Sequence, residues 1–276
     1  MWEAVERFHG LVYLAPEPRT EATTAGLKGF WMNYFASRVA PLGAVSAAAV
    51  SSTFFYYGPS RVHRAIPDAW SFATPTDIID ARYRGMRQAL ARVYGSTGQD
   101  AEIAEAASLV RRATEGATPI GRLLFAGWNS LEWPAEPHLA LWHGCTLLRE
   151  YRSGNHLIAL CAEGLSGCES IVSHVAVDAA PSEWIHDEAG WTKADSQAAV
   201  ASLQERGWLD ASGAATAACH EGRARIEAMT DALDFGVWQH LGENGGSRLF
   251  DLLADLASLL PPDDQLDWRK IYESDV

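Results

Sequence analysis

The sequence predicts a mainly α-helical fold, in which a bundle of helices forms the body and a shorter helix, a small β element and a long helix follow. Apolar residues recur at helical spacing over most of the 276 residues, with proline and glycine between the repeats. Alternating apolar and polar residues, which are typical of strands, are nearly absent outside residues 208–215. Hydrophobic residues make up 48% of the chain, which is enough for a sizeable core.

Proline and glycine also mark where the helices are expected to begin and end. The helices predicted for the body are Glu3–Leu14, Gly26–Ser37, Leu42–Phe55, Ser60–Ile66, Pro75–Tyr94, Asp100–Glu115, Ile120–Leu131, Glu136–Arg152, Asn155–Glu163 and Cys168–Ala176. We assign residues 1–180 to this helical body, which holds a small-molecule pocket, and 181–240 to a second domain. Residues 241–276 are expected to form a last helix, near Gly245–Leu260, and an acidic tail that packs back on the body.

The second domain has clear local signals. Thr192 is suited to cap a helix, and Gly207 is suited to the left-handed position after its end. Residues 208–213 predict a short strand and a tight turn, and a long helix is expected from about Thr216 to Leu233. The apolar positions expected to face inward on the first helix are Ala198, Val200, Ala201 and Leu203.

This order resembles the C-terminal half of MarR-like winged-helix domains, in which a recognition helix, a β wing and a further helix follow one another. Four phrases elsewhere resemble a largely uncharacterised actinobacterial helix-turn-helix family: residues 34–43, 55–70, 141–150 and 206–209. The resemblance implies a winged helix but no defined activity. Residues 152–156 lack the acidic position of the family pattern, and Asp187-Glu188-Ala189 stands where a basic residue is expected.

The charge of the chain argues against nucleic acid as a partner. Between Trp184 and Asp234 there are four Lys/Arg and nine Asp/Glu, whereas a phosphate-binding surface needs the opposite balance. The whole chain carries a net charge of −13. We therefore expect DNA binding to be weak, and we expect a cytoplasmic protein without a membrane span, since the longest apolar stretch, residues 39–50, is too short. The sequence is compatible with a homodimer.

The helix Glu136–Arg152 carries the best polar constellation. Its apolar residues surround the whole helix, as in a buried helix whose polar residues must find partners. His143 and Glu150 are seven residues apart, which places them about 20° from each other around the helix, with Thr146 between them. We predict that Glu150 and His143 form an acid–base pair inside the bundle. The alternative is a structural network that ties neighbouring helices together.

Further residues are candidates for substrate binding around this pair. An arginine among rings stacks on them or binds a carboxylate in bidentate fashion, which singles out Arg38. The candidate substrate-binding residues are Arg38, Tyr34, Tyr56, Trp142, Arg149, Arg152 and His156. Neither the spacing of His138, His143 and Cys145 nor that of the four cysteines suits a metal, and the chain lacks a nucleotide-binding motif, so we expect no metal and no cofactor.

Two functions follow from these observations. The first is a small-molecule-binding protein of actinobacterial specialised metabolism, working as a cofactor-independent enzyme that condenses or cyclises an aromatic or cationic substrate, with the winged helix as scaffold. The alternative is a ligand-responsive winged-helix transcriptional regulator. A positive face on the helix that begins after Thr192 would favour the regulator.

Overall fold

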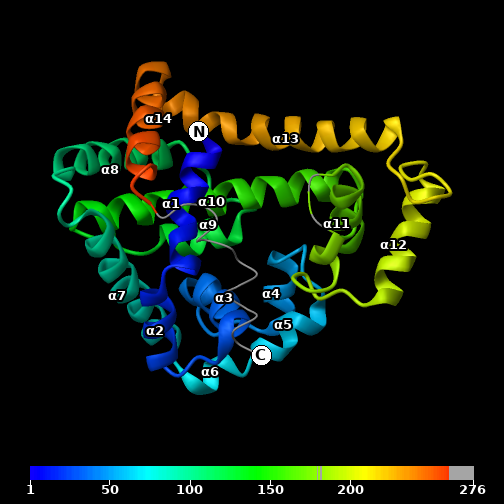
Figure 1. The fold of residues 1–276 in the computed structure, drawn as a ribbon, viewed down its shortest axis with the longest axis horizontal. Helices are drawn as coiled ribbons and strands as arrows, with labels where there is room; N and C mark the ends of the chain where they lie inside the picture. Colours follow the sequence, from blue (N-terminus) through cyan, green and yellow to red (C-terminus); the bar gives the residue numbers. More distant parts are fainter. Residues whose placement is uncertain (179, 181, 261–276) are drawn as a thin grey trace.

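The computed structural model describes residues 1–178, 180 and 182–260, and the part that it describes is mainly α-helical, as predicted (Figure 1). The helices of the body are α1 (Trp2–Leu14), α2 (Pro16–Thr24), α3 (Gly29–Val39), α4 (Ala47–Thr53), α5 (Pro59–Ala65), α6 (Ala69–Phe72), α7 (Pro75–Tyr94), α8 (Asp100–Glu115), α9 (Leu123–Asn129), α10 (Pro137–Ala162) and α11 (Gly167–Ala176). They are followed by α12 (Lys193–Glu205), α13 (Ala217–Leu241) and α14 (Glu243–Ala257), and short 3-10 turns occupy Ala40–Leu42 and Ser182–Ile185. The acidic tail, residues 261–276, lies outside the described residues.

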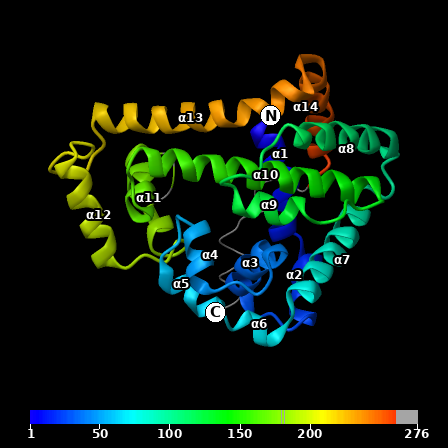
Figure 2. The same cartoon turned by 180° about the vertical axis from the view of Figure 1, so that it is seen from behind.

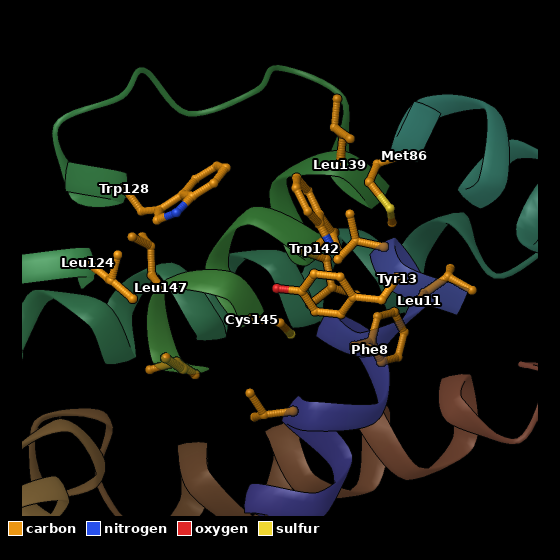
Figure 3. Close-up of a cluster of buried hydrophobic side chains, with 14 of the residues drawn as sticks. Phe8, Leu11, Tyr13, Met86, Leu124, Trp128, Leu139, Trp142, Cys145 and Leu147 are labelled. Atoms are coloured by element: carbon orange, nitrogen blue, oxygen red, sulfur yellow. The ribbon is translucent and has the colours of Figure 1, made fainter. Parts of the chain in front are cut away.

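Helix α10 is the centre of the molecule. It contacts α1, α7, α8, α9 and α13, and α13 lies alongside it at one edge of the protein (Figures 1 and 2). Figure 3 shows side chains from α1, α7, α9 and α10 that meet in the main core, among them Phe8, Trp128 and Trp142. Most side chains of α10 from Leu139 to Tyr151 are therefore buried, as the apolar pattern predicts.

The sequence predicted two helices where α10 is continuous. Ser153, Gly154 and Asn155 are weak helix formers, and they suggested a break. In the structure Asn155 is completely buried; its side-chain oxygen accepts a hydrogen bond from Arg122 Nε at 2.5 Å, and its Nδ2 donates to Asp234 at 2.6 Å. These contacts between helices hold α10 together against the local preference.

A second apolar cluster joins α10, α11, α12 and the first half of α13. Its members include Leu160, Val172, Leu203, Trp208 and Ile226. The cluster thus contains residues on both sides of the boundary predicted at residue 180, and the division into domains stays a prediction. Helix α13 belongs to both clusters, because its later residues, such as Leu241, pack in the main core.

The local signals of the second domain are mostly confirmed. The side chain of Thr192 accepts a hydrogen bond from the backbone of Asp195, so the predicted cap is present, and Gly207 has φ +77°. Ala199 and Leu203 are the buried residues of α12. The prediction that Ala198 and Ala201 face inward is wrong, because both are exposed. The buried face of α12 is narrow, because its two buried residues are four positions apart. A run of small apolar residues does not show which of them lie on that face.

The small β wing is reduced in the described residues to one antiparallel bridge, between Leu209 and Ala215. Trp208 lies beside it and is 3% exposed, packed against Gly222 of α13 so closely that a Cβ at Gly222 would lie 2.1 Å from its ring. A tryptophan, and not a strand pair, therefore fixes this turn to α13. Among the described helices, none has a stretch long and apolar enough to span a bilayer.

Candidate functional site

Glu150 of α10 lies at the centre of a buried ion-pair cluster. Its carboxylate accepts two hydrogen bonds from Arg38 of α3, at 2.9 Å from Nε and 2.7 Å from Nη2. Arg38 Nη1 donates to the Tyr34 hydroxyl at 2.7 Å, and Arg149 Nη1 lies 3.4 Å from the same carboxylate. Glu150 is 1% exposed and Arg38 is 4% exposed. Of the residues expected around the pair of His143 and Glu150, the structure places Arg38 directly against Glu150.

These charges decide the protonation of Glu150. Burial alone would raise the pKa of its carboxyl, but the neighbouring charges of Arg38 and Arg149 outweigh burial and hold the pKa below its usual range. Glu150 is therefore ionised at neutral pH. An anion held by two guanidinium groups is a weak proton acceptor and a strong link between α3 and α10.

His143 lies in a different environment. Its Nδ1 is 2.7 Å from the hydroxyl of Tyr83, and the ring of Trp133 lies edge-on at 4.8 Å between centroids. Burial, together with the charge of Arg111, lowers the pKa of His143 to about 4, so the imidazole is neutral at neutral pH. Nε2 is buried and has no hydrogen-bond partner among the described residues.

The structure thus gives His143 and Glu150 separate hydrogen-bond partners, although both are on the buried α10. Between them, Thr146 Oγ1 lies 3.1 Å from Nδ1 of His9, whose pKa burial and nearby arginines lower well below its usual value. Trp142 is completely buried, with the guanidinium of Arg82 5.5 Å from its ring. The catalytic roles assigned to His143 and Glu150 stay predictions.

Two other candidates meet at the second apolar cluster. Tyr56 stacks on His156, with 6.1 Å between ring centroids, and His156 Nδ1 lies 2.9 Å from Thr230 Oγ1 of α13. Burial, followed by the charges of Arg223 and Arg152, lowers the pKa of His156 to about 4. These contacts link the body to α13. They lie further along α10 than the Glu150 cluster.

Arg152 lines a pocket of about 300 Å³ that lies between α1, α10 and α13 and is open to solvent. The residues that line it are Met1, Trp2, Val5, Leu148, Tyr151, Arg152, Asp231, Asp234, Phe235, Val237 and Trp238. Its walls are mostly apolar and carry four aromatic rings, and the polar groups gather on one side. We refer to it as the α13 pocket.

The polar side of the α13 pocket is an ion-pair network. Arg152 Nη1 donates to Asp231 at 2.8 Å and to Asp234 at 2.5 Å, and its guanidinium lies 5.2 Å from the ring of Trp2. Asp234 also accepts the hydrogen bond from Asn155. Burial raises the pKa of Asp234 above its usual range, although the hydrogen bonds from Asn155 and Arg152 lower it.

Of the residues that line the α13 pocket, Arg152 alone was a candidate from the sequence. A signal was present on α13, where Asp231, Asp234, Phe235 and Trp238 follow one another at spacings that share one helix face. The opposite wall comes from Trp2, far away in the sequence. Without the packing of α1 on α10, nothing in the sequence brings these residues together.

The basic residues of the helix-turn-helix segment are largely engaged within the protein. Glu163 of α10 pairs with Arg206, 3.3 Å between Nη2 and Oε1, and with Arg225, 2.6 Å between the same atom types. Arg223 lies 3.6 Å from Glu227. The exposed positions of α12 include Lys193 and otherwise mostly short or uncharged side chains: Ala194, Gln197, Ala198 and Ala201.

Comparison with known proteins identifies one family. A family profile described as a helix-turn-helix family matches residues 1–264, which is nearly the whole chain. No curated protein and no solved structure gives a significant match. The likeness to MarR and the actinobacterial origin stay predictions.

Proposed function

This chain belongs to the helix-turn-helix family that matches residues 1–264, and we propose that it binds a small organic ligand in the α13 pocket while its helix-turn-helix segment serves as scaffold. The observation that carries the proposal is the pocket itself. Ligand sites are concave, mainly apolar and aromatic, and carry a few polar groups that fix orientation, with volumes from about 300 Å³ upward. The α13 pocket has each of these properties.

The charges around α12 support the scaffold role. DNA is held by arginine and lysine side chains that reach phosphates, and each such contact needs a cation free to approach. Arg206 and Arg225 share Glu163 as a partner, and Arg223 pairs with Glu227. We therefore propose that the segment stabilises α13 and does not recognise a DNA sequence.

A catalytic form of this function gives acid–base chemistry to α10. Of the two residues proposed, His143 is the one without an ionic partner, since its imidazole is neutral and its Nε2 has no partner in the described part of the chain. Neither residue lines the α13 pocket, and burial lowers the pKa of His143 to about 4, so this form requires a substrate that reaches α10 beyond the pocket. Glu150 then has a positioning role, through Arg38 and Tyr34. Condensation or cyclisation of an aromatic or cationic substrate remains the reaction class that we propose.

Ligand binding is tested with a neutral aromatic probe, 2-phenylethanol, by saturation-transfer NMR. We expect a signal that Phe235→Ala weakens, because Phe235 lines the pocket and is 59% exposed, so its loss does not disturb the core. Phe250→Ala on α14 is the matched control, as Phe250 is 46% exposed and lies outside the pocket lining. Equal signals from the two variants would refute binding in the pocket.

The family match favours a second candidate, a ligand-responsive regulator. Helix α13 gives this candidate a physical basis, because one half packs with α11 and α12 while the other half lines the pocket. Fluorescence anisotropy with genomic DNA fragments distinguishes the two functions. Sequence-dependent affinity below about 1 µM at physiological salt would favour the regulator, since specific complexes typically reach 10⁻⁸ M or tighter.

A further inference from the structure

We propose that the ligand of the α13 pocket is an organic ammonium ion with an aromatic or apolar group. The inference rests on the proposed function, because it names the ligand class of the same pocket. Three features of the pocket carry it: the rings of its walls, the sign of its charge and its size.

The rings come from all three helices of the pocket: Trp2 of α1, Tyr151 of α10, and Phe235 and Trp238 of α13. The face of an aromatic ring is electronegative and attracts cations, and cages of such rings recognise ammonium groups. The guanidinium of Arg152 already lies 5.2 Å from the centre of the Trp2 ring. A ring of this pocket therefore accepts a cation within the protein itself.

The charged side chains that line the pocket are two carboxylates, Asp231 and Asp234, and one guanidinium, Arg152. Glu227 lies 3.6 Å from Arg152 and 3.6 Å from Arg223, so its charge beside the pocket is balanced by Arg223. Both aspartates bind the same nitrogen of Arg152, so an incoming carboxylate would meet an arginine that is already neutralised. The negative balance favours a cation, as does the net charge of −13 over the whole chain.

Asp231 is the group best placed to bind the ammonium. Its side chain is 69% exposed, and it contacts Arg152 through Oδ1. A carboxylate offers about four acceptor positions on its two oxygens, so Asp231 can accept from a second cation while it keeps Arg152. Asp234, which is 5% exposed and also binds Asn155, holds Arg152 in place.

The size of the pocket limits the ligand. A volume of about 300 Å³ is at the lower end of the range for ligand sites. One aromatic ring with a short aminoalkyl chain matches this volume, and the ring would pack against Phe235 and Trp238 while the ammonium faces Asp231.

The test compares three probes that share a phenyl ring and differ in charge: phenethylammonium, 2-phenylethanol and 3-phenylpropionate. Dissociation constants are measured on the full chain by titration in ligand-observed NMR at pH 7. We expect phenethylammonium to bind about fivefold more tightly than 2-phenylethanol, and 3-phenylpropionate to bind most weakly. Added salt is expected to weaken the binding of phenethylammonium and to leave 2-phenylethanol unchanged.

Two variants assign the effect to the pocket. Asp231→Asn is expected to weaken phenethylammonium about threefold to fivefold and to leave 2-phenylethanol unchanged. Asp251→Asn, on the exposed face of α14, makes the same change in net charge outside the pocket and is expected to have no effect. Phe235→Ala is expected to weaken both probes.

The outcomes separate this inference from the proposed function. If 3-phenylpropionate binds most tightly and Phe235→Ala weakens it, the pocket binds ligands but the ammonium class is wrong. Equal affinity of the charged and neutral probes, or equal effects of Asp231→Asn and Asp251→Asn, would also overturn the inference while the pocket stands. If Phe235→Ala affects none of the probes, both the inference and the proposed function fail.

Discussion

Glu150 and Arg38 are 112 residues apart in the sequence, and the two hydrogen bonds between them join α10 to α3 in the centre of the protein. Neither side chain is more than 4% exposed. Removal of one partner of a buried ion pair leaves the other charge without compensation, which is costly even where the pair itself adds little stability. The pair is thus a point at which a single substitution has a large effect.

We expect Glu150→Gln to lower the free energy of unfolding by about 3 kcal/mol, because Arg38 then remains buried without its counter-charge, whereas Arg149 keeps Glu6 at 3.4 Å. Urea denaturation followed by circular dichroism measures the change. Glu105→Gln, which removes one partner of the exposed pair between Glu105 and Arg248, is the control and is expected to have a much smaller effect. Equal stability of Glu150→Gln and the wild type would contradict the assigned role.

Replacement of both partners provides a second check. In a double variant, Arg38→Met with Glu150→Leu, neither charge remains, so we expect its loss of stability to be smaller than the sum of the two single variants. A strictly additive result would mean that the two side chains do not stabilise each other, whatever their distance.

The buried histidines predict how stability depends on pH. Burial lowers the pKa of His143 to about 4, below the value of about 6.5 in an unfolded chain. A group with a lowered folded-state pKa binds its proton more readily when unfolded. Its stabilising contribution is therefore complete above pH 6.5 and is lost as the pH falls toward 4, with a slope of up to about 1.4 kcal/mol per pH unit for each such histidine.

His143→Gln is expected to reduce this slope between pH 6.5 and 4, since glutamine does not titrate. Urea denaturation at a series of pH values measures it. His220→Gln on the exposed start of α13 is the matched control and should leave the slope unchanged. A wild-type stability that stays constant over this interval would show that the buried imidazoles are not shifted.

Gly222 and Gly246 form a pair of helical glycines with opposite surroundings. A Cβ at Gly222 would lie 2.1 Å from the ring of Trp208, whereas a Cβ at Gly246 has no atom within 4 Å. We expect Gly222→Ala to destabilise the protein by about 1–3 kcal/mol, because Trp208 must move. Gly246→Ala is expected to be neutral or to stabilise by up to about 1 kcal/mol, since alanine favours helix. Thermal denaturation measures the stability of both variants. If Gly246→Ala destabilised the protein as much as Gly222→Ala, the packing of Trp208 against Gly222 would not explain the loss.

Local chemistry made much of the fold predictable from the sequence. Thr192 and Gly207 mark the ends of α12 through hydrogen bonding and backbone conformation, which depend on few neighbours. The break expected within α10 did not form, because Asn155 is held by Arg122 and Asp234 from distant parts of the chain. Contacts of this kind have no local signal.

The candidate site was also predictable only in part, since some of its contacts have a local signal and others depend on packing. Arg38 was expected either to stack on neighbouring rings or to bind a carboxylate, and in the structure it does both, with Phe54 and with Glu150. The relation of His143 to Glu150 was inferred from angular position alone. Seven residues along a helix span about 10 Å, so a shared face does not give shared partners. The aromatic wall of the α13 pocket depends on Trp2, whose place follows from packing.

The last prediction concerns the helix-turn-helix segment, whose three arginines, Arg206, Arg223 and Arg225, are paired with carboxylates of the protein. Glu163 pairs with both Arg206 and Arg225, but Arg206 also donates to the backbone carbonyls of Glu163 and Gly164, so Glu163→Gln should release mainly Arg225 toward solvent. We expect the wild type to bind a random DNA duplex weakly, and Glu163→Gln to bind it more tightly with a salt dependence steeper by about one phosphate contact. Fluorescence anisotropy between about 20 and 150 mM salt measures both quantities.

Glu136→Gln, which frees Arg87 on α7 with the same change in net charge, is the control. An equal gain in the two variants would mean that net charge alone governs binding, and tight binding by the wild type would mean that the pairing with Glu163 does not suppress it.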